Sequence, residues 1–201
     1  MRISKKAKEE NRGKILQVAA RLFVEKGFAE TTTRDIAGAM GMAAGTMFNY
    51  FDNKEVLAMT LVAEAMETGR EAYLRRRTGQ EDLAEELFLL ISSELRMLKP
   101  YKGFIGPVLE SAMSLFPKNT ANSAGEKSRA HHMELVEAIT RRQGYSSVPA
   151  LIAATLYWSL YLGILAFWVR DQSRNQEETL ALIDYSLQLF SQTLSGNSHQ
   201  Q

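Results

Sequence analysis

The chain has 201 residues, 45% of them hydrophobic, which is enough for one or two domains with an apolar core. The absence of cysteine excludes disulfides and thiolate metal sites, and it suits a reducing cytoplasm. The net charge is only +1, but residues 1–54 hold 10 Lys and Arg against 6 Asp and Glu, a basic excess typical of a DNA-facing surface.

The N-terminal sequence MRISKKAKEENR is basic and has no apolar run, so no signal peptide is predicted. Residues 1 to about 8 form either a solvated tail or an arm that touches DNA. From Lys8 to Lys26, apolar residues recur every three or four positions, and this predicts an amphipathic helix that ends at Gly27.

The stretch from Thr32 to Lys54 contains two short helical patterns separated by a glycine. Ile36, Ala37 and Met40 face one core in the first pattern, and Gly41 supplies the sharp turn that follows. The second pattern has an outward face of small, uncharged side chains. This layout predicts a helix-turn-helix with its second helix in the major groove of DNA.

This segment resembles the DNA-binding domain of the TetR family of transcriptional regulators. The matching residues include Thr32, Ile36 and Ala37, followed by the run Gly41-Met42-Ala43-Ala44-Gly45-Thr46-Met47-Phe48-Asn49-Tyr50-Phe51-Asp52-Asn53-Lys54-Glu55-Val56-Leu57. Two positions differ from the usual pattern, since Phe48 replaces a tyrosine that reaches DNA and Ala43 replaces a serine that starts the recognition helix.

The resemblance implies a DNA-binding role for nine residues. Arg34 and Thr46 are expected to contact base edges, with a phosphate contact as the alternative for Arg34. Contacts to the DNA backbone are expected from Thr33, Asn49, Tyr50 and Lys54. The rest of the DNA-binding surface is expected to consist of Ala44, Gly45 and Phe48.

Six further helices are predicted after the helix-turn-helix. Their ranges are residues 54–77, 80–99, 104–116, 126–143, 148–169 and 176–194, with a polar loop at 118–125. The fold class is therefore all-α, with about nine helices. A three-helix DNA-binding domain at 1–54 precedes a larger effector-binding and dimerisation domain at 55–201.

Residues 148–169 contain no charged side chain and are long enough to span a membrane. Tyr157, Trp158 and Tyr161 lie in the middle of the segment rather than at its ends, which favours a helix buried in a protein instead. A membrane-anchored DNA-binding protein remains the alternative function.

The last two helices are expected to form a four-helix bundle with a second copy, as the TetR resemblance implies. Small residues in the first of them would allow close approach, and the apolar stripe of the second would pair with the partner. The predicted dimerisation residues are Ser159, Gly163 and Ala166, then Ile183, Leu187 and Phe190.

No phosphate-binding loop, zinc spacing or nucleophile motif is present, so the chain is not expected to be an enzyme or to hold a cofactor or metal. The adjacent pair His131 and His132 lacks the spacing of a metal site. The resemblance implies a cytoplasmic homodimeric regulator, most often a repressor, of a near-palindromic operator. Its effector is expected to be apolar or aromatic and to touch Met66, Met113 and Trp158 or Tyr161. A protein that has lost DNA binding is a third interpretation.

Overall fold

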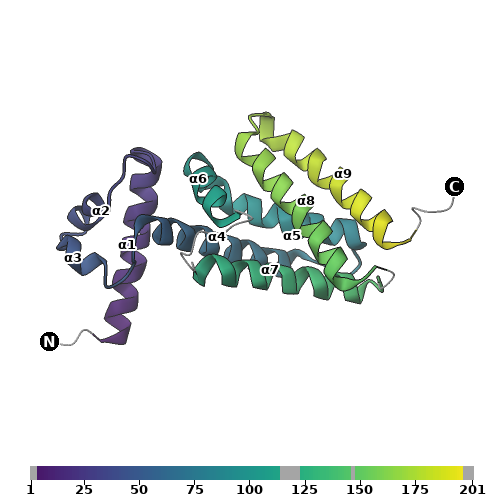
Figure 1. Ribbon diagram of the computed structural model, residues 1–201, viewed down its shortest axis with the longest axis horizontal. Coiled ribbons are helices and arrows are strands. Elements are labelled where there is room, and N and C mark those ends of the chain that lie inside the picture. Colours follow the sequence, from purple (N-terminus) through teal and green to yellow (C-terminus); the bar gives the residue numbers. More distant parts are fainter. Residues whose placement is uncertain (1–3, 114–122, 146–147, 197–201) are drawn as a thin grey trace. The chain divides into compact units, whose positions relative to one another are not determined.

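The computed structural model describes residues 4–113, 123–145 and 148–196, and every element in these ranges is helical. The order is α1 (Lys5–Glu25), α2 (Thr33–Ala39), α3 (Ala44–Met47), α4 (Lys54–Arg76), α5 (Leu83–Leu98), α6 (Lys102–Met113), α7 (Ser123–Arg142), α8 (Ala150–Arg170) and α9 (Glu177–Leu194), with 3₁₀ turns at Lys99–Tyr101 and Arg174–Gln176 (Figure 1). The predicted all-α fold with an N-terminal helix-turn-helix is confirmed. The helix α7 begins earlier than predicted, at Ser123, inside the stretch expected to be a loop.

The chain packs as two compact units. The first unit comprises residues 1–64 and 100–125, and the second comprises 65–99 and 126–201. The helix α4 therefore contributes residues to both units, and α6 belongs to the first. This division differs from a single boundary after residue 54, because packing joins α6 to the N-terminal helices.

Side-chain caps fix where the helices of the first unit begin. Ser4 accepts a hydrogen bond from the amide of Ala7 at the start of α1, and Thr32 and Asp35 form a capping box at the start of α2. Hydrogen bonds from Lys26 and Thr32 lower the pKa of the Asp35 carboxyl to about 2. The carboxylate therefore stays ionised at neutral pH.

Aromatic rings connect α6 to the first unit. The ring of Phe104 lies 5.1 Å from that of Phe23 in α1 and 6.4 Å from that of Phe28 in the following loop. Phe23 and Phe104 are both buried. Aromatic pairs at these distances add attraction beyond their buried area, so this cluster holds α6 against α1.

In the second unit, α9 packs against both α5 and α8, and α8 runs alongside it (Figure 1). The helices α4 and α5 approach each other closely at Gly69. A Cβ atom at this position would lie 2.5 Å from the Cα of Glu94, so only glycine allows the two backbones to come this close. The approach sets Arg70 of α4 beside Glu94 of α5.

The helix α8 carries much of its apolar surface outside the unit. It is long and apolar enough to cross a membrane, and only 22% of its most apolar window is buried. Large exposed side chains include Leu151, Ile152, Leu156 and Phe167. This exposed face needs a cover, which a partner protein or a lipid phase could supply.

Candidate functional sites

The helix-turn-helix presents the predicted reading surface to solvent. Ile36, Ala37 and Met47 are buried between the helices, and Gly41, where a sharp turn was predicted, has a positive φ of 65°. Opposite this core, the exposed residues are Arg34, Gly45, Thr46, Phe48 and Asn49, whereas Thr33, Ala44 and Tyr50 are half-buried. The geometry therefore leaves these predicted contact residues accessible to a ligand.

Arg34 lies on α2, and within the described part of the chain no carboxylate pairs with it. Its five N–H donors are available for a guanine edge or a phosphate. The Tyr50 hydroxyl accepts a hydrogen bond from Asn11 Nδ2 at 3.3 Å, which leaves its own hydrogen free to be donated.

Lys54 has a different environment from the one predicted. Its ammonium group donates to the carbonyl oxygens of Phe28, Ala29 and Thr31 at 2.9, 3.1 and 3.2 Å, and it lies 4.6 Å from the centre of the Phe28 ring. An ammonium group has three donors, and the three carbonyls occupy them. The predicted phosphate contact of Lys54 is therefore corrected, because the residue ties the start of α4 to the loop between α1 and α2.

The second unit contains a buried polar cluster that the sequence did not predict. Glu94 of α5 is fully buried, and its carboxylate accepts hydrogen bonds from Arg70 at 2.9 Å and from the Tyr161 hydroxyl at 2.9 Å. The Nδ1 atom of His132 lies 3.0 Å from the same carboxylate. Since a carboxylate only accepts, this nitrogen carries a proton and donates it.

The cluster continues on either side of Glu94. The Nε2 atom of His132 lies 2.9 Å from the Tyr157 hydroxyl, and Arg70 also donates to Ser128 at 3.1 Å and to Glu67 at 2.8 Å. The partners of Glu94 come from α4, α7 and α8, so one carboxylate joins four helices.

Ionisation in the cluster follows from these contacts. Burial alone would raise the pKa of Glu94, but His132 and Arg70 outweigh it and hold the pKa below its ordinary value. Burial and the Glu94 charge raise the pKa values of Tyr157 and Tyr161 well above 10. The cluster therefore contains an ionised carboxylate among neutral phenols at neutral pH.

A second polar group surrounds Glu86, eight residues earlier on α5. Its carboxylate accepts a hydrogen bond from the Tyr73 hydroxyl at 2.7 Å and one from Arg142, and Arg77 lies 3.7 Å away. Burial and this carboxylate raise the pKa of Tyr73 to about 12. This group again joins α4, α5 and α7.

Three of the four predicted effector residues lie at the Glu94 cluster. The Met66 sulfur is 3.6 Å from the Ser128 hydroxyl, the Trp158 ring is 5.4 Å from the Tyr161 ring, and Tyr161 binds Glu94. The Arg129 guanidinium lies 4.7 Å from the Trp158 ring. Met113 ends α6 in the other unit, and its side chain lies outside the described residues.

The adjacent histidines have separate carboxylate partners. His131 lies 2.9 Å from Glu67, whereas His132 faces Glu94. In the described ranges, no group of three or more His, Cys, Asp or Glu side chains is arranged to hold a metal ion.

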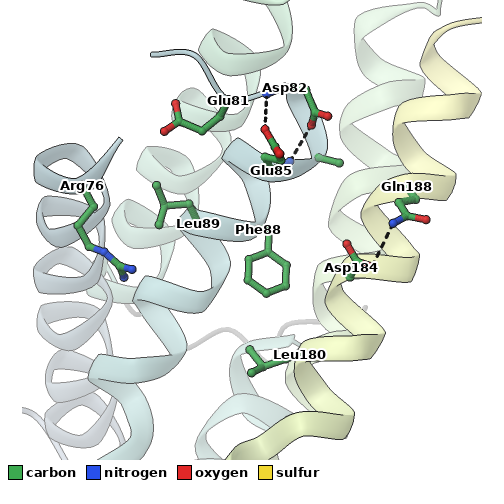
Figure 2. A pocket seen from close by; sticks show the side chains of 10 residues that line it. Arg76, Glu81, Asp82, Glu85, Phe88, Leu89, Leu180, Asp184 and Gln188 are labelled. Carbon is green, nitrogen blue, oxygen red and sulfur yellow. Dashed lines mark hydrogen bonds between the residues drawn. The ribbon is translucent and has the colours of Figure 1, made fainter. Parts of the chain in front are cut away.

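An open groove of about 850 Å³ runs between α5 and α9. Phe88 points into it from α5, and Leu180 lies below on α9 (Figure 2). Its other lining residues are Arg76, Glu81, Asp82, Ala84, Glu85, Leu89, Asp184 and Gln188. None of the predicted effector residues lines this groove.

The predicted dimerisation residues fall into two classes. Ser159, Gly163 and Ala166 lie exposed on α8, where a partner could reach them. Ile183, Leu187 and Phe190 are buried in their own unit, so the prediction that they form the dimer interface is corrected. The exposed apolar residues of α9 are instead Leu180, Tyr185 and Leu189.

Two family profiles match the chain. Residues 15–60 match the profile described as bacterial regulatory proteins, tetR family, and residues 87–200 match the tetracyclin repressor-like C-terminal domain.

Similar curated proteins match part of the chain. The transcriptional repressor KstR2 of Rhodococcus jostii is 46% identical over 48 residues, which are 24% of each chain. The regulator TtgR of Pseudomonas putida is 33% identical over 87 residues, which are 43% of this chain and 40% of TtgR. The matched segments thus span less than half of the length of these relatives.

Solved structures match nearly the whole chain. Thermus thermophilus FadR, a TetR family repressor in complex with lauroyl-CoA, has a TM-score of 0.69 at 21% identity, covering 90% of this chain and 93% of FadR. Bacillus subtilis FadR in complex with stearoyl-CoA has a TM-score of 0.64 at 20% identity, covering 89% and 96%. At these identities the likeness establishes the fold.

The three carbonyl contacts of Lys54 lead to a prediction about its substitution by methionine. Lys54→Met removes the three hydrogen bonds but keeps a similar apolar stem, so we expect the protein to lose about 1–3 kcal/mol of stability. The slope of log DNA affinity against log salt concentration should stay unchanged, because no phosphate contact is lost.

Thermal unfolding and DNA titrations at several salt concentrations measure both effects. Arg75→Met is the matched control, since Arg75 forms an exposed ion pair with Glu71 on the same helix. If the salt dependence of DNA affinity became shallower by about 0.9 and stability did not change, Lys54 would be a phosphate contact after all.

Proposed function

Because this chain belongs to the TetR family of bacterial regulatory proteins, we propose that it is a cytoplasmic, ligand-responsive repressor that binds a near-palindromic operator as a homodimer. The observation that carries the proposal is the exposed face of the helix-turn-helix, which lies inside the matched residues 15–60. Arg34 reads a guanine edge and Thr46 assists on α3. Thr33, Asn49 and Tyr50 contact the DNA backbone, and the small Ala44 and Gly45 let α3 approach the bases.

We expect the purified protein to select a defined, near-palindromic site from random duplex DNA. Arg34→Ala should then lose discrimination between the selected site and one with the contacted base pair changed, by about 1–3 kcal/mol. Electrophoretic mobility titrations at one salt concentration measure this difference. An equal loss on both sites would make Arg34 a phosphate contact, and the absence of any selected site would exclude operator binding altogether.

The dimer interface is proposed to lie on the exposed face of α8 and the adjoining face of α9. On α8, Ser159, Gly163 and Ala166 form a row of small exposed residues beside the apolar Leu156, and on α9 Tyr185 is 65% exposed. Small residues let helices approach closely, and a second copy would cover the apolar side chains. A homodimer is also typical of the family.

We expect Leu156→Glu to convert the dimer to a monomer, because the dimer would bury an unpaired carboxylate in each subunit. Sedimentation velocity measures the change. Val24→Glu is the control, since Val24 is an exposed apolar residue on α1, outside the proposed interface. If Leu156→Glu stayed dimeric, the interface would lie elsewhere on the protein. Recovery of the wild-type protein only in detergent would instead support the membrane-anchored alternative, which rests on the same apolar helix.

The effector is proposed to be apolar or aromatic and to bind at the Glu94 cluster. Met66, Trp158 and Tyr161 supply adaptable and flat apolar walls there, while Ser128 and Arg70 offer polar groups that fix orientation. The groove between α5 and α9 is less suitable, since it is open and two of its carboxyl residues, Asp82 and Glu85, already cap α5. The predicted contact of Met113 remains a proposal.

We expect an effector that releases DNA to change the fluorescence of Trp158. A suitable panel contains uncharged aromatic compounds together with lauroyl-CoA and stearoyl-CoA, the ligands of the two FadR structures. Trp158→Phe should abolish most of the response while the remaining Trp168 still reports folding. If a compound that releases DNA still bound Trp158→Phe and still changed its fluorescence, the effector site would lie elsewhere.

A further inference from the structure

Phe48 is an apolar ring on the surface that is proposed to face DNA. It caps the C-terminal end of α3, and its side chain is 51% exposed. Met47, its neighbour in sequence, is fully buried, so an apolar core lies beside this helix. Phe48 points outward because successive residues of a helix face different directions.

The rest of α3 offers few polar groups for reading bases. Ala43 and Gly45 are exposed and Ala44 is half-buried, none with a hydrogen-bonding side chain. Among residues 43–49, only Thr46 and Asn49 have side chains that can form hydrogen bonds. The largest exposed side chain of the recognition helix is therefore one that cannot form a hydrogen bond.

The major groove contains one apolar group that distinguishes the bases, the C5-methyl group of thymine. A phenyl ring has no donor or acceptor for the other base edges, and placing it against them would leave their polar atoms unpaired. A phenyl ring against a methyl group removes apolar surface of both from water. The chemistry of the exposed ring therefore selects thymine.

We infer that Phe48 is a specificity-determining residue that reads thymine methyl groups in each half-site. The inference rests on the proposed operator binding and extends it, since it names the base and the chemical group recognised. Arg34 then reads by hydrogen bonds and Phe48 by apolar contact. A ring packed only on sugar or phosphate would not depend on the methyl group, and this difference makes the inference testable.

The experiment uses the full-length protein and the site selected from random duplex DNA. Each thymine of the site is replaced in turn by deoxyuridine at symmetric positions of both half-sites, which removes only the methyl group. At one thymine position we expect the affinity to fall about fourfold for each methyl group removed, or roughly 15-fold for the symmetric pair. This is the loss expected when one buried apolar carbon is removed from each half-site.

Two variants of Phe48 identify the residue responsible. Phe48→Ala should bind the thymine and deoxyuridine sites equally at that position, whereas Phe48→Tyr keeps the ring and should keep the discrimination. Val24→Ala, an exposed apolar substitution outside the reading surface, should behave as wild type. All titrations are made at one salt concentration, because phosphate contacts change affinity with salt.

The outcomes separate the inference from the proposed function. A selected site that is insensitive to every deoxyuridine substitution overturns the reading role of Phe48 while operator binding stands. Discrimination that persists unchanged in Phe48→Ala also overturns it, because another residue then contacts the methyl group. If no site is selected at all, the proposed function and the inference both fail.

Discussion

The buried carboxylate of Glu94 is the interaction on which the second unit depends. Moving a charge out of water costs several kcal/mol unless nearby groups compensate it. Arg70, His132 and Tyr161 provide this compensation from α4, α7 and α8, and the close approach at Gly69 brings the first of them into reach. The positions of four helices are therefore specified together, because losing any donor leaves part of the carboxylate buried and unpaired.

The helix α4 is fixed at two places by quite different contacts. Lys54 in its first turn binds three carbonyls of the loop after α1, and Arg70, sixteen residues later, binds the buried Glu94. Both residues belong to the helix Lys54–Arg76. Each unit thus has its own polar attachment to α4, and both attachments use a long basic side chain whose donors meet several acceptors.

Periodicity predicted the helices well but could not distinguish what covers each apolar stripe. In α9, the regular spacing of Ile183, Leu187 and Phe190 correctly indicated a buried face, yet these residues are buried within their own unit. The polar clusters were missed because their members lie far apart in sequence. A signal was nevertheless present, since Glu86 and Glu94 fall within the apolar stripe of α5, where a charge requires buried partners.

The role of Lys54 could not be predicted either, because three carbonyl oxygens carry no sequence signature. Because backbone carbonyls of the protein occupy the Lys54 ammonium group, Arg34 is the cation that remains on the reading surface. In the described α2 and α3, Arg34 has no carboxylate partner, and it lies beside the uncharged exposed face of α3. Such a surface has few groups to neutralise phosphates, so a single half-site should bind weakly. Linking two readers raises the effective concentration of the second at its half-site, and affinity then comes from dimerisation. On this argument the dimer interface proposed on α8 would contribute to DNA binding without touching DNA.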